Sequence, residues 1–101
     1  MKVRNFRFVS DPGHGYLRVK LEDLVKYGVE KKISGYSFKS DRFAFLEEDV
    51  DASTFFNALL DAGDTYELKT SYVNNPASCR RLPRFPESEE YVAYRKEMFG
   101  F

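Results

Sequence analysis

The chain is poor in several residue types, and each scarcity excludes a class of protein. Its 101 residues contain one cysteine, one histidine and no tryptophan. The single cysteine, Cys79, excludes an intramolecular disulfide framework and a cysteine-based zinc cluster. Apolar runs are far shorter than the roughly 18 residues that a membrane span needs, and the first residues lack the apolar core of a signal peptide. We therefore expect a cytoplasmic protein with no membrane segment.

The chain also lacks net charge. Its 16 Lys and Arg residues balance its 16 Asp and Glu residues, which argues against a generic binder of polyanions and against an acidic mimic of DNA. The balance hides a segregation, because residues 1–46 carry a charge of +5, residues 47–67 a charge of −7 and residues 68–101 a charge of +2. Such patterning bears on association rather than on fold. It favours a surface of two signs, suited to a partner protein or to a homodimer, and it leaves a local basic face open.

Aromatic residues are abundant instead, with 10 Phe and 7 Tyr, and the hydrophobic content of 43% is too high for a disordered chain. Alternation and helical spacing predict strands at 2–9, 16–20, 33–39, 43–47 and 66–73 and helices at 21–27, from Asp51 or Ser53 to Gly63, and at 87–99. Residues 74–86 form an irregular connection. We predict a single α+β domain over residues 1–101, in the order β-β-α-β-β-α-β-α, with a mostly antiparallel sheet and helices on one side.

The most unusual local feature is the glycine-rich loop at residues 10–16. Its two glycines flank the only histidine, so that His14 is accessible as an acid, a base or a ligand, with Asp11 to orient it and Ser10 as a nominal nucleophile. The alternative is a turn between two strands, in which Asp11 caps the turn and His14 faces solvent. The spacing of a P-loop is absent, and no cofactor is indicated.

An acidic run follows the fourth predicted strand. Its carboxylates are candidate ligands for Mg²⁺ or Ca²⁺: Glu47, Glu48, Asp49 and Asp51. The alternating pattern of a calcium loop is missing, and neighbouring residues of a strand point to opposite faces. Capping of the next helix, where acids favour the positive end of the helix dipole, is the alternative that we prefer.

A third cluster combines arginines with aromatic residues. Arg80, Arg81 and Arg84 can grip phosphates or carboxylates, or else pair with the acidic segment as parts of a solvated loop. Cys79 lies beside two of them, which favours its thiolate, but no histidine relay is recognisable. The residues that we predict to bind a partner are Asp11, Gly13, His14, Gly15, Tyr16, Tyr36, Arg80, Arg81 and Arg84. Tyr72 and Tyr94 are further candidates for a contact surface.

Three stretches together carry a resemblance: FVSDPGHGYL at 8–17, ISGYSF at 33–38 and FLEEDVDA at 45–52. They resemble a group of small proteins encoded by bacteriophages, prophages and plasmids. The resemblance covers about residues 6–63 and leaves out residues 74–101. It implies a protein of a phage or mobile element that acts in a bacterial cytoplasm, and it supplies no catalytic residue.

We expect from these patterns a non-enzymatic module that binds a host or phage protein, for example to inhibit a bacterial defence or regulatory protein. One alternative is a small hydrolase, dependent on a metal or on His14 and the carboxylates. Another is a nucleic-acid-binding protein that uses Arg4, Arg7 and the three arginines of the third cluster. The enzyme hypothesis requires His14 and the acidic segment to share one pocket.

Overall fold

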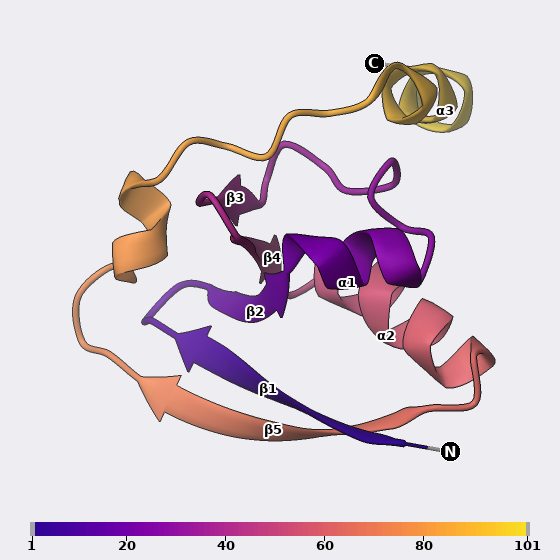
Figure 1. Ribbon diagram of the computed structural model, residues 1–101. Helices are drawn as coiled ribbons and strands as arrows, with labels where there is room; N and C mark the ends of the chain where they lie inside the picture. Colours follow the sequence, from indigo (N-terminus) through magenta and orange to yellow (C-terminus); the bar gives the residue numbers. More distant parts are fainter. Residues whose placement is uncertain (1, 101) are drawn as a thin grey trace.

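Five strands form one mixed sheet in the order β3-β4-β2-β1-β5 (Figure 1). The computed structural model describes residues 2–100, so that residues 1 and 101 of the predicted domain lie outside the described part. The strands are β1 (Val3–Ser10), β2 (Gly15–Lys20), β3 (Phe38–Lys39), β4 (Phe43–Glu47) and β5 (Thr65–Tyr72). The helices are α1 (Leu21–Lys26), α2 (Asp51–Asp61) and α3 (Glu89–Phe99), with a 3₁₀ turn η1 at Ser78–Arg81. The predicted α+β class and element order are confirmed.

Most strand contacts are antiparallel, but β5 pairs with β1 in parallel, with Val3 opposite Thr65 and Ser10 opposite Tyr72. The reason is the connection through α2. Because β1, β2 and β4 pair antiparallel in turn, β4 and β5 run in the same direction, and only a crossover such as a helix can join two strands of that kind.

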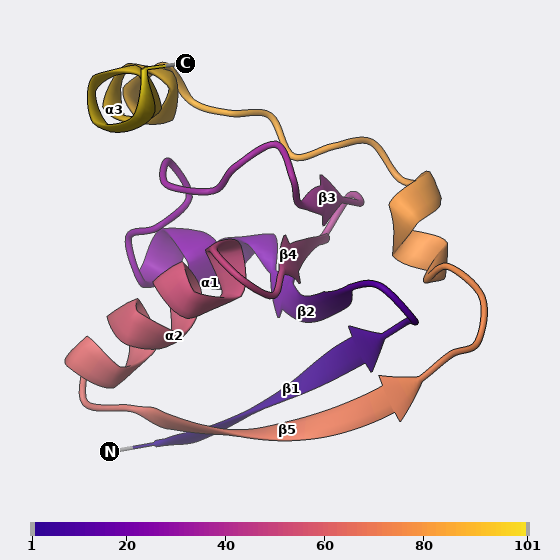
Figure 2. The same ribbon diagram turned by 180° about the vertical axis from the view of Figure 1, so that it is seen from behind.

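One face of the sheet is covered by α1 and α2 (Figure 2). Alternate residues of the strands point toward these helices, because successive side chains of a strand leave opposite faces. The centre of this core is Phe55, whose ring lies 5.3 Å from that of Phe6 and 5.6 Å from that of Tyr27, both edge to face. The buried residues around it include Leu17, Val19, Leu24, Ala44, Leu46 and Leu59.

The other face carries a second, smaller core under the connection that follows β5. Ala77 and Cys79 pack there against Tyr16 and Phe38, which point away from the helices. Partly buried Leu82 completes the cover. The connection was predicted to be irregular; it is anchored by these contacts and forms η1, which lies across the sheet from α1 and α2 in Figure 1.

Residues 33–37 are not a strand, and the prediction of a strand there is wrong. The cause is Asp51, which is fully buried and accepts hydrogen bonds from the amide and hydroxyl of Ser34 and from the hydroxyl of Ser37. A buried carboxylate needs such donors, so the chain folds into a turn around it. Asp51 therefore does not cap α2, whose N-cap residue is Val50 and has no side-chain capping bond.

Helix α3 stands apart from the sheet in both views and contains no fully buried residue (Figures 1 and 2). It begins after Ser88, whose hydroxyl accepts from the amide of Tyr91 at 3.0 Å and donates to the carbonyl of Lys31 at 2.6 Å. Within residues 2–100, none of the helices has both the length and the apolar character needed to cross a bilayer.

Candidate functional site

The histidine loop is a closed turn held by Asp11. One carboxylate oxygen of Asp11 accepts from the amides of Gly13 and His14, at 3.0 and 2.8 Å, and the Asp11 amide donates to the carbonyl of His14 at 2.8 Å. Gly15 ends the loop where the ring of Phe8 and the carboxylate of Glu48 come so close that a Cβ atom has no room. The loop conformation is therefore fixed by local hydrogen bonds and by one required glycine.

Asp11 also ties the loop to the connection over the second core. Its other oxygen accepts from the amide of Ala77 at 2.9 Å and lies 3.5 Å from a guanidinium nitrogen of Arg80. The Asp11 side chain is 1% exposed. Its pKa is lowered to about 2, chiefly by the hydrogen bond from the amide of Ala77. The amides of Gly13 and His14 and the charge of Arg80 add smaller contributions. Its oxygens are thus used by the backbone and by Arg80, and among the described contacts none goes to the imidazole of His14.

A cleft of about 630 Å³ opens beside this loop and brings together four segments that are distant in sequence. Its polar lining residues are His14, Tyr36, Glu47, Asp49, Arg80 and Arg84. Its apolar lining includes Tyr16, Phe38 and Leu82 of the second core. We call this hollow the histidine cleft. It unites most of the predicted binding residues with part of the acidic segment.

Each of the two arginines of the cleft has one guanidinium nitrogen in contact with an oxygen of the protein. Arg84 donates to the carbonyl of Gly35 at 3.0 Å, and its guanidinium lies 5.3 Å from the centre of the Phe38 ring. Arg80 is fixed by Asp11. A guanidinium has five N–H donors in a rigid fork, so each arginine retains donors for an anionic group of a ligand. Arg81, also predicted to bind, is exposed and does not line the cleft.

The four predicted metal ligands lie in different environments. Glu47 lines the histidine cleft, and its carboxylate accepts from the amides of Asp49 and Val50 at 3.0 and 3.2 Å. Glu48 lines a separate hollow with Ser10 on the side of the sheet that carries α2. Asp51 is buried and accepts hydrogen bonds from the hydroxyls of Ser34 and Ser37. Within residues 2–100, no group of three or more His, Cys, Asp or Glu side chains is arranged to hold a metal ion.

The catalytic candidates are also separated. His14 lines the histidine cleft, whereas Ser10 lines the hollow beside α2, so the nucleophile and the base that the sequence suggested do not share a cavity. Cys79 is buried under the connection, and burial raises the pKa of its thiol to about 11. The expected stabilisation of the thiolate by neighbouring arginines is therefore wrong, because desolvation outweighs their charge.

Sequence reasoning missed the floor of the cleft and the position of Asp49. Phe38 and Leu82 were assigned no function, although both line the cleft. Asp49 was proposed as a metal ligand; it lines the same cleft as two arginines. Comparisons with protein-family models, with curated proteins and with solved structures find no match.

Proposed function

We propose that this chain is a non-enzymatic protein-binding module, and that the histidine cleft holds an acidic group of the partner. The observation that supports this most is the exposed Tyr36 beside Arg80 and Arg84 at the rim of a partly apolar hollow. Tyrosine and arginine are the residues that most often dominate the free energy of binding at protein interfaces. The arginine forks suit a carboxylate, and the apolar floor suits the side chain next to it.

The two signs of the cleft supply specificity. Glu47 and Asp49 line the same hollow as the arginines, so a purely anionic ligand meets repulsion on one side. A peptide segment that carries an acid next to a base or a hydrogen-bond donor satisfies both sides. On the resemblance to phage and mobile-element proteins, we propose that the partner is a bacterial protein, and that inhibition of a defence or regulatory protein is one form of this function.

The test is capture of a partner from a bacterial lysate, followed by titration calorimetry with the purified partner. We expect Tyr36→Ala and Arg84→Glu to weaken binding at least roughly tenfold, as hot-spot substitutions do. Arg81→Glu is the matched control, because it makes the same change of charge three residues away and outside the cleft. Failure to recover a stoichiometric partner, or equal effects of Arg81→Glu and Arg84→Glu, contradicts the proposal.

A second candidate function rests on one observation: His14 lines the same cleft as Glu47 and Asp49. The cleft thus meets the condition that we set for a hydrolase based on histidine and carboxylate. Its test is hydrolysis of nitrophenyl esters and phosphates by the protein, His14→Ala and Glu47→Gln, with Lys32→Ala as a control on an exposed residue. Turnover that persists in His14→Ala, or no turnover at all, removes this candidate.

A further inference from the structure

A notch opens in the sheet where β1 and β2 part. Their pairing begins at Arg7 opposite Arg18, whereas the first half of β1 pairs only with β5. The chain after Arg18 turns away through Lys20 into α1. A hollow of about 310 Å³ lies at this point, and its lining includes Arg4, Arg7, Arg18, Lys20, Asp23 and Phe43. Four of these residues are basic, and Asp23 is the one acid among the described lining residues.

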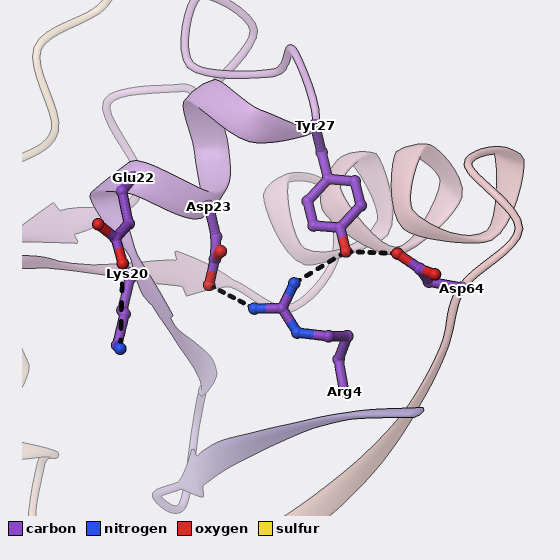
Figure 3. Close-up of polar contacts among 6 residues, drawn as sticks. All are labelled: Arg4, Lys20, Glu22, Asp23, Tyr27 and Asp64. Atoms are coloured by element: carbon purple, nitrogen blue, oxygen red, sulfur yellow. Dashed lines mark hydrogen bonds and ion pairs between the residues drawn. The ribbon is translucent and has the colours of Figure 1, made fainter. Parts of the chain in front are cut away.

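Part of this charge is already neutralised. Arg4 donates to Asp23 at 3.0 Å and to the hydroxyl of Tyr27 at 2.9 Å, and Tyr27 donates to Asp64 at 2.7 Å (Figure 3). The hydrogen bond to Asp23 raises the pKa of Arg4, so the guanidinium keeps its charge. Lys20 faces Glu22 at 4.0 Å, and both side chains are exposed, so this contact is weak (Figure 3). The notch therefore retains an excess of positive charge, carried by Arg7, Arg18 and Lys20.

Arg7 and Arg18 belong to a row of three cations across the open face of the sheet. Lys69 of β5 is opposite Arg7, and Arg7 is opposite Arg18. Among the described contacts, none of the three forms an ion pair. Like charges directly opposite each other disfavour strand pairing, so the fold does not require this row. An anionic ligand offsets that repulsion.

An aromatic ring lies under one of these cations. The guanidinium of Arg18 is 3.8 Å from the centre of the Phe43 ring, a distance typical of stacking. The ring holds the guanidinium in place, and among the described contacts its N–H donors have no hydrogen-bond partner, so they are available to a phosphate. A guanidinium plane also accepts an unpaired base on its outer side, as in the recognition of single-stranded nucleic acids.

We propose that the notch and the row of Lys69, Arg7 and Arg18 bind single-stranded nucleic acid through its phosphates, with one base stacked over Arg18 and Phe43. The three cationic side chains leave the open sheet face from neighbouring strands, whose backbones are about 5 Å apart. A base in a duplex is already stacked and paired, so only a single strand uses both parts of the site. This site is independent of the histidine cleft and goes beyond the function proposed for it.

The test is fluorescence anisotropy with a labelled oligothymidine, the corresponding RNA, a DNA duplex and a polyglutamate peptide. We expect the single strands to bind at about 50 mM salt. If three phosphates are neutralised, the slope of log K against the logarithm of the salt concentration is about −2. Arg7→Glu and Lys69→Glu each weaken binding about tenfold and reduce the slope. Phe43→Ala weakens binding at least about fivefold.

A stability measurement and a control variant distinguish loss of binding from loss of the fold. Lys69→Glu places an acid opposite Arg7, so it raises the midpoint of thermal unfolding while it weakens binding. Lys32→Glu makes the same change of charge on an exposed lysine of the segment after α1, and it leaves binding unchanged. The proposal is overturned by absence of oligonucleotide binding at low salt, by equal effects of Lys32→Glu and Arg7→Glu, or by equal binding of polyglutamate or duplex.

Discussion

The two faces of the sheet differ in how they are covered. Two helices bury one face around Phe55, with side chains that are apolar almost throughout. On the other face a short connection covers only a patch around Tyr16 and Phe38, and the uncovered part includes the row of Lys69, Arg7 and Arg18. The first face therefore supplies most of the stability. The second is free to carry the histidine cleft and the basic row, because little of the hydrophobic free energy depends on it.

The largest expected effect concerns the helix-covered face. Phe55→Ala removes a fully buried ring in contact with Phe6 and Tyr27, and we expect a loss of about 3–5 kcal/mol in the free energy of unfolding, measured by denaturant titration. Leu60→Ala is the control, because Leu60 is on the same helix and 49% exposed. A loss below about 1 kcal/mol for Phe55→Ala contradicts this view of the core.

A smaller effect is expected at the glycine that ends the histidine loop. A Cβ atom at Gly15 collides with Phe8 and Glu48, so Gly15→Ala costs about 1–3 kcal/mol through overpacking. Gly13→Ala is the matched control, because open space surrounds that position. Denaturant titration of both variants measures the difference. Equal stabilities show that Phe8 moves aside and that the loop is less constrained than the geometry indicates.

The anchor of the second core is tested by Asp11→Asn. Asparagine has one acceptor oxygen where aspartate has two, so it cannot accept both from the amides of the histidine loop and from the amide of Ala77. The link between loop and connection is then broken, the connection loosens and the buried thiol of Cys79 becomes reactive. We expect faster labelling of Cys79 by a maleimide at neutral pH, with the helix-covered core intact by circular dichroism. Unchanged labelling kinetics contradict the role of Asp11 as the anchor.

The same residue gives a dependence on pH. The Asp11 pKa is about 2 in the folded protein, below the ordinary aspartate value of 3.8, so its ionised form stabilises the fold fully above about pH 4. This contribution is lost as the pH falls from there through about 2. The free energy of unfolding of the wild type should therefore decline more steeply in this range than that of Asp11→Asn. Parallel curves contradict the assignment.

The smallest effect belongs to neither face. Lys31 and Glu90 form an exposed ion pair at 3.3 Å between the segment after α1 and helix α3. Lys31→Ala should change the free energy of unfolding by less than about 1 kcal/mol, as exposed pairs do. A larger loss in thermal or denaturant unfolding shows that α3 is coupled to the body more tightly than its exposure suggests.

Local signals of the sequence were sufficient for most elements. Alternation identified β1 and β5, and helical spacing identified α2, which ends before Gly63 at a φ of +85° as expected for a glycine. The turn at 33–37 was missed because its pattern alternates like a strand, while its cause is a carboxylate 14 residues or more away in sequence. Local patterns contain no information about such a partner.

The candidate site shows the same limit. The histidine loop, the acidic run and the arginines were each recognised as unusual, but their meeting in one cleft depends on the path of the connection over the second face. Asp11 was recognised as a turn-former, and its bond to the amide of Ala77 links residues 66 positions apart. The basic row required the parallel register of β5 beside β1, which no local pattern predicts.

The pairing of β1 with β5 also has a consequence for synthesis of the chain. Strand β1 leaves the ribosome before β5 and finds this neighbour only when residues 65–72 have emerged. Until then one edge of β1 is unpaired, and closing this pairing costs the entropy of a long loop. Folding is therefore expected to be completed late and to be slow for a domain of this size. A nascent chain stalled before Thr65 displays an open strand edge to other chains and to chaperones.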